Sequence, residues 1–139
     1  MKPTAILFPV LLQVALTFGV LIAMGPARAR SMRENGQQLS DDDVRLGRNA
    51  WSDQAVKVAK SYANQFELPV LFYAVVAFAL ITSAVDGLML GLAWIFAVSR
   101  VAHAYVHIGP NVIMWRGAAF LIGALALIAM WLKLALHIL

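Results

Sequence analysis

The sequence predicts an all-α membrane protein, a bundle of four transmembrane helices. Hydrophobic residues make up 62% of the 139-residue chain and charged residues only 13%, whereas a soluble domain carries about 25% charged residues. The apolar residues also gather in four runs, each at least as long as the roughly 20 residues that a spanning helix needs. So much apolar surface cannot be buried in one small globular core. An integral membrane protein is therefore expected.

Cysteine content and net charge narrow the class of function. The chain has no cysteine, which excludes disulfides, thiolate-bound metals and a thiol nucleophile of its own. The net charge of +4 would also fit a nucleic-acid partner. Most of the Lys and Arg residues, however, lie in one loop beside a membrane segment, where topology and anionic lipid explain them better. We expect membrane lipids as partners and no nucleic acid.

The first apolar run predicts a spanning helix over about 4–25. Lys2 before the run and arginines after it also resemble a cleaved signal peptide. The run exceeds the 7–15 apolar residues usual in signal peptides, however, and arginines behind it are typical of a stop-transfer segment. We therefore expect this helix to stay in the protein.

A polar stretch follows, predicted to be a loop over about 26–53. Within it, Ser40 followed by Asp41, Asp42 and Asp43 indicates a helix N-cap with acids in the first turn. A metal site on the three aspartates is the alternative. It is less favoured because adjacent side chains on a helix point in different directions.

The remaining runs predict helices over about 54–83, 88–108 and 112–137, so residues 1–139 form one domain. Pro69 lies inside the second helix, where it removes a backbone donor and favours a kink. Asp86-Gly87 and Gly109-Pro110-Asn111 are typical of the two tight turns.

The basic residues predict the orientation in the membrane. Lys2 and Lys133 lie at the end of the bundle opposite to the polar loop. The loop and the adjacent helix start carry seven basic residues, which are Arg28, Arg30, Arg33, Arg45, Arg48, Lys57 and Lys60. By the positive-inside rule the loop is cytoplasmic and both termini lie outside. The short loops fit a bacterial inner membrane with periplasmic termini.

Two polar clusters lie inside the apolar runs. The second run contains Lys60, Asn64 and Glu67, and the third contains Arg100, His103 and His107, with Arg116 early in the fourth. Ionisable residues in a membrane segment cost about 2.5–3.5 kcal/mol on insertion scales, so they are functional-site candidates.

Depth and spacing predict that the two clusters meet. At about 1.5 Å per residue, Glu67 lies roughly 15 Å from Lys57 and Arg100 lies roughly 12 Å from Ile108. Both depths are measured from the cytoplasmic side. The spacings of three and four residues also place each cluster on one helix face.

Two interpretations of the clusters follow. A Glu67–Arg100 ion pair with Asn64 and His103 beside it would neutralise the buried charges and form a structural network. Alternatively, further cations and donors, namely Lys60, His107 and Arg116, would line a cavity open to the cytoplasm. That surplus of positive charge would suit an anionic ligand.

A metal site is a third interpretation of the histidines. His103 and His107 are four residues apart and could ligate a metal ion. Arg100 lies beside them and the sequence offers no third ligand, so no metal is expected.

The combination of these motifs resembles the MAPEG family, the membrane-associated proteins in eicosanoid and glutathione metabolism. The resemblance covers the four-helix plan and the long first loop. It is sharpest at Asn64-Gln-Phe-Glu67-Leu-Pro69 and at Arg100-Val-Ala-His103, with Arg116 sixteen residues after Arg100.

The resemblance implies a homotrimer of four-helix protomers that binds glutathione between subunits near the cytoplasmic side. It assigns activation of the thiol to Arg116, and the glutathione site to Asn64, Glu67, Arg100 and His103. The chain departs from the eicosanoid-type enzymes, which carry arginines at positions 60 and 63 and a tyrosine at position 107. Here these residues are Lys60, Ala63 and His107, as in a divergent bacterial member.

The sequence thus leaves two main classes of function. The first is an enzyme resembling glutathione transferases or peroxidases, in which Arg116 stabilises the glutathione thiolate while it attacks a lipophilic substrate or reduces it. Lys60 and His107 would join the cofactor-binding residues. The second is a non-catalytic membrane scaffold or lipid-binding module whose polar network is structural. A transporter is less favoured because four helices are few and no inverted repeat is visible.

Overall fold

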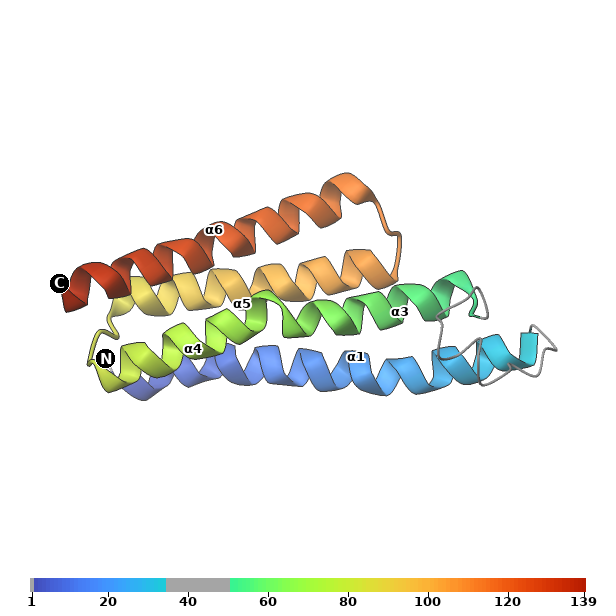
Figure 1. Ribbon diagram of the computed structural model, residues 1–139, viewed down its shortest axis with the longest axis horizontal. Helices are drawn as coiled ribbons and strands as arrows, with labels where there is room; N and C mark the ends of the chain where they lie inside the picture. The colour runs from blue at the N-terminus through green and yellow to red at the C-terminus, as the bar shows by residue number, and fades with distance from the viewer. Residues whose placement is uncertain (1, 35–50) are drawn as a thin grey trace.

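The computed structural model describes residues 2–34 and 51–139, and all regular structure in these ranges is helical (Figure 1). The elements are η1 (Pro3–Ile6), α1 (Leu7–Glu34), α3 (Asp53–Ala63), η2 (Asn64–Phe66), α4 (Leu68–Ile81), α5 (Gly87–Ile108) and α6 (Ile113–Ile138). Together they form four helical segments long and apolar enough to cross a membrane. The predicted four-helix membrane bundle is confirmed. The proposed cap at Ser40 and Asp41–Asp43 lies outside the described residues.

The first helix is longer than the sequence predicts. Its end was predicted at residue 25, but α1 continues through Pro26 to Glu34 over 28 residues, which corresponds to about 42 Å. Pro26 removes one helical hydrogen bond, to the Ile22 carbonyl, and its ring crowds that carbonyl, but the helix continues on both sides of it. Beyond it, the backbone amide of Ser52 donates to Ser31 Oγ at 2.7 Å, which joins the end of α1 to the start of α3.

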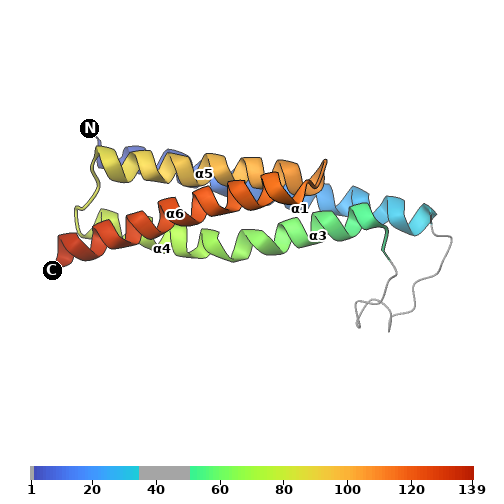
Figure 2. The same cartoon turned by 90° about the horizontal axis from the view of Figure 1, so that it is seen from above.

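The helices run roughly side by side along one axis, and α3 and α4 follow each other as two pieces of one rod (Figures 1 and 2). The N-terminus, the C-terminus and the turn between α4 and α5 lie at one end of the bundle. The turn between α5 and α6 lies at the other end. This end also carries the start of α3, since Gln54 Nε2 donates to the Ile108 carbonyl at 3.2 Å.

The buried interior divides into an apolar half and a polar half. The apolar half lies toward the termini, where Phe72 of α4 stacks on Phe96 of α5 with ring centroids 4.4 Å apart. Its other members include Ile6, Val75, Val76, Ala79, Met89, Leu127 and Met130. The polar half contains the buried Gln13, Ser61, Gln65, Arg100, His103 and His107. The bundle therefore concentrates its desolvated polar groups toward one end.

The second spanning segment is interrupted rather than merely kinked. The α-helix α3 ends at Ala63, three residues form the 3-10 turn η2, and Glu67 has φ −94° and ψ −103° before α4 begins. Pro69 stands at the start of α4, where a proline needs no amide partner. A single helix over 54–83 was predicted. The break arises because Pro69 cannot donate to the Gln65 carbonyl and its ring would clash there.

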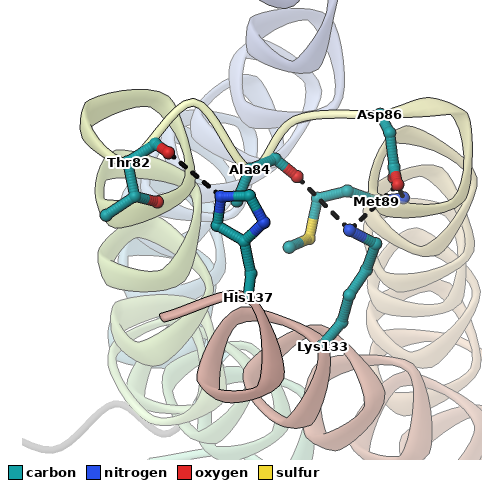
Figure 3. A network of polar contacts seen from close by, with 6 residues as sticks. All are labelled: Thr82, Ala84, Asp86, Met89, Lys133 and His137. Carbon is teal, nitrogen blue, oxygen red and sulfur yellow. Dashed lines mark hydrogen bonds and ion pairs between the residues drawn. The ribbon is translucent and has the colours of Figure 1, made fainter. Parts of the chain in front are cut away.

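Polar contacts join the C-terminal part of α6 to the turn between α4 and α5 (Figure 3). These contacts are called the clasp below. Lys133 Nζ lies 3.0 Å from Asp86 Oδ2, and His137 Nε2 lies 3.2 Å from the Thr82 carbonyl. Asp86 also accepts the Met89 backbone amide at 2.9 Å, which caps the start of α5. These contacts lower the pKa of the Asp86 carboxyl, first through the Met89 amide and then through Lys133.

We expect Asp86→Asn to remove the acid sensitivity that this clasp gives the bundle. A carboxyl whose pKa is lower in the folded state stabilises the fold above its unfolded value, about 3.9. That contribution is lost as pH falls through the folded value. Thermal unfolding in detergent between pH 3 and pH 7 tests this, because the asparagine retains the cap but not the charge. An unchanged pH dependence in the variant would show that other titratable groups cause it.

Candidate functional site

The helix break creates the first feature of the site by releasing a backbone acceptor. In an unbroken helix the Asn64 carbonyl would accept the amide of Leu68. Here the chain changes direction at Glu67, and the Asn64 carbonyl instead accepts Arg100 Nη2 of α5 at 2.9 Å. A side chain from another helix thus satisfies the acceptor that the break frees, as interrupted membrane helices require.

Arg100 is the second feature, because it is a buried cation with few partners. Its side chain is 1% exposed, yet Nε and Nη1 have no hydrogen-bond partner among the described residues. A guanidinium carries five N–H donors in a planar fork that matches a carboxylate. Arg100 therefore has spare donors for an anionic oxygen ligand.

Asn64 and the two histidines form the third feature. The Asn64 Nδ2 atom lies 3.5 Å from His103 Nε2 and 3.5 Å from His107 Nδ1. His103 Nδ1 lies 3.1 Å from the Arg116 carbonyl. Because a carbonyl can only accept, His103 carries its proton on Nδ1, and its Nε2 is the acceptor that faces the Asn64 amide.

Arg116 joins this cluster from the start of α6. Its backbone carbonyl accepts from His103, and its Nη1 donates to Asn111 Oδ1 at 2.8 Å. The amide of Asn111 orients the guanidinium but does not neutralise it. In the part of the chain that the structure describes, no carboxylate pairs with Arg116. Among the described residues, neither arginine of the cluster therefore has a carboxylate within ion-pair distance.

The Glu67–Arg100 ion pair expected from the sequence is not formed between the described residues, where the single ion pair joins Lys133 and Asp86. The physical reason is the helix break. Glu67 is the residue at which the chain turns, and it is exposed. The regular spacing that would place it on one face with Asn64 ends at Ala63.

Lys60 also lies outside the contacts of the cluster. It is exposed and lines a groove with Arg28 and Trp51 between α1 and α3. The structure thus brings together Asn64, Arg100, His103, His107 and Arg116 in one protomer, and it leaves Lys60 and Glu67 at the surface.

Two residues that the sequence analysis did not single out support the break from the side of α1. Gln13 Nε2 donates to Gln65 Oε1 at 2.9 Å, and Gln65 Nε2 donates to the Ser61 carbonyl at 3.0 Å. Both glutamines are at most 1% exposed. The available signal was Gln13 itself, a lone amide in an otherwise apolar run.

Asn111 was interpreted only as a turn residue, but it also orients Arg116. The turn needs it as well, because Asn111 has a positive φ of 52°, a conformation that asparagine tolerates better than most residues. Asn111 therefore has two roles: its backbone forms the turn, and its side-chain oxygen accepts a hydrogen bond from Arg116.

The chemistry of the cluster favours an anion over a metal ion. No group of three or more His, Asp, Glu or Cys residues with metal-ligand geometry occurs in residues 2–34 and 51–139. Two guanidiniums within the same cluster would repel a cation and attract a carboxylate or thiolate.

Comparison with known proteins places the chain in a family. No curated protein and no solved structure matches it significantly. The sequence model of the MAPEG family matches residues 6–136, which is nearly the whole chain. Four membrane-spanning segments fit that match. The protein is thus an integral, multi-pass membrane protein that belongs to the MAPEG family, the membrane proteins of eicosanoid and glutathione metabolism.

Proposed function

We propose that this protein binds glutathione, or a closely similar anionic thiol peptide, and conjugates it through its sulfur to a lipophilic substrate from the membrane, or reduces that substrate. The binding site would face the cytoplasm between subunits of a homotrimer in a bacterial inner membrane. Arg116 would stabilise the thiolate, and Asn64, Arg100, His103 and His107 would hold the peptide. Lys60 and Glu67 would contribute from the surface.

The observation that carries the proposal is the buried guanidinium of Arg100, whose Nε and Nη1 have no hydrogen-bond partner among the described residues. A buried cation without full hydrogen bonding is expensive in a low-dielectric interior, so a purely structural network would be expected to pair it. An anionic ligand would supply the missing acceptors. Glutathione offers two carboxylates and, when ionised, a thiolate.

A second observation concerns the route for the lipophilic substrate. An apolar groove of about 450 Å³ runs between α4 and α6, and its lining includes Leu68, Leu71, Leu127 and Trp131. Leu68 directly follows the helix break, four residues after Asn64. A substrate dissolved in the bilayer could therefore lie along this groove with its reactive end close to the polar cluster.

The reaction would need little beyond positioning and charge. The thiolate sulfur attacks an electrophilic carbon, a C–S bond forms, and the leaving group departs with its electron pair. With a lipid hydroperoxide, two thiols would instead be oxidised to a disulfide while the hydroperoxide is reduced to an alcohol and water. In both cases a fixed guanidinium lowers the energy of the reacting anion.

Calorimetry with two peptides tests the proposal. Protein purified in detergent is titrated with glutathione and with ophthalmic acid, which carries an ethyl side chain in place of the thiol. We expect saturable binding of both and tighter binding of glutathione, because only the thiolate can use Arg116. Turnover is measured with chlorodinitrobenzene, whose chloride leaves as the sulfur adds.

Three outcomes are informative. Binding and turnover of glutathione support the proposal. Equal affinity for both peptides without turnover would indicate an anion site that does not activate the thiol. Absence of both binding and turnover would overturn the proposal and favour a membrane scaffold whose polar cluster is structural.

A further inference from the structure

We propose that the groove between α1 and α3 binds the headgroup of an anionic phospholipid. This groove, called the α1–α3 groove below, has a volume of about 270 Å³ and is lined by Arg28 of α1, by five residues of α3 and by Trp51 before α3. It shares Lys60 with the residues proposed for glutathione but does not include Asn64, Arg100 or the histidines, and the inference does not depend on the proposed function.

The charge of the groove selects an anion. Its lining contains two cations, Arg28 and Lys60, and no acidic residue. Neither cation has a carboxylate partner among the described residues. Arg28 instead lies over the Trp51 ring, with its Cζ atom 5.2 Å from the ring centroid, a contact that leaves its charge uncompensated.

The two cations reach the groove from different helices. Arg28 comes from α1 and Lys60 from α3, and both line the same volume of about 270 Å³. A phosphate bound in this volume would be attracted by both charges.

The depth and the floor of the groove fit a lipid rather than a free ion. Trp51 lies at its outer end, and tryptophan prefers the boundary between headgroups and water. The floor is apolar, formed by Ala55, Ala59 and neighbouring small residues along α3. From Asp53 to Ala63 the helix covers roughly 15 Å. A helix surface of this length could accommodate the first part of a lipid acyl chain, next to the bound phosphate.

Quenching of Trp51 by brominated lipids tests this inference. The protein is reconstituted in phosphatidylcholine vesicles that contain a small fraction of phosphatidylglycerol, with bromine on the acyl chains of one lipid at a time. The signal of Trp51 is isolated by subtracting the signal of Trp51→Phe. Two basic residues beside an anionic headgroup predict a preference for phosphatidylglycerol on the order of tenfold.

A charge-matched control separates the groove from the basic surface as a whole. The double variant Arg28→Gln with Lys60→Gln should lose the preference. The double variant Arg30→Gln with Lys57→Gln removes the same charge from the same two helices outside the groove and should keep it. Equal loss in both variants would overturn the inference in favour of general surface attraction.

A second measurement covers the case in which Trp51 reorients when Arg28 is replaced. Phospholipid retained per protomer after detergent purification is counted by mass spectrometry. The groove variant should retain less phosphatidylglycerol than the control variant. If inorganic phosphate or glutathione abolishes the quenching preference in the unmodified protein, the two cations serve a soluble anion and the lipid assignment is wrong.

Discussion

Arg116→Ala is expected to lower glutathione-dependent turnover by about 100-fold or more, because removing one preorganised donor to a developing anion has an effect of this size. The surroundings of Arg116 are suited to stabilising a thiolate. Its guanidinium is oriented by Asn111 Oδ1 at 2.8 Å, a neutral partner that leaves the positive charge available. Steady-state turnover of chlorodinitrobenzene by the purified variant measures the effect.

The pH profile distinguishes a role in the chemistry from a loss of structure. Without Arg116, thiolate formation loses its electrostatic support, and the rising limb of the rate profile should move to higher pH. Arg116→Lys keeps a charge and should recover part of the rate. Asn111→Gly keeps the positive φ of the turn and leaves the arginine in place but unanchored, and a loss of roughly tenfold is expected. A large loss of rate in Arg116→Ala with an unmoved pH profile would contradict the assignment.

Arg100→Met is expected to weaken glutathione binding by roughly 10- to 100-fold, the value of a charge-assisted hydrogen bond, without destabilising the bundle. Two effects on folding oppose each other. The variant leaves the Asn64 carbonyl unsatisfied, at about 1–3 kcal/mol. It also removes a buried cation with two unpartnered nitrogens, whose desolvation penalty is several kcal/mol. The second effect is larger, so the melting temperature should stay the same or rise.

Calorimetry measures the affinity for glutathione, and thermal unfolding of the same preparation measures the stability of the bundle. Gln65→Leu is the matched control. Gln65 is buried at the helix break, directly after Asn64, and its replacement removes polar contacts but no charge. It eliminates two buried hydrogen bonds and should lower the melting temperature. If Arg100→Met lowers it as much, Arg100 belongs to a structural network and the ligand assignment is wrong.

The sequence alone determined the fold class, because hydrophobicity and length act locally. Runs of about 20 apolar residues have no other stable state than a spanning helix, and the structure has four such segments. The spacing of Arg100, His103 and His107 within one regular helix also placed them on a common buried face. Such a regular helix transmits sequence spacing directly into geometry.

The tertiary structure decided how the helix break between α3 and α4 places its polar groups. Pro69 predicted a distortion, but not that the chain would turn at Glu67, expose its carboxylate and leave the Asn64 carbonyl to Arg100. The pairing of Gln13 with Gln65, 52 residues apart, likewise depends on how α1 packs against α3. Sequence spacing predicts direction only while the helix is regular. Where the backbone is interrupted, the contacts between helices determine which polar groups are satisfied and which stay free for a ligand.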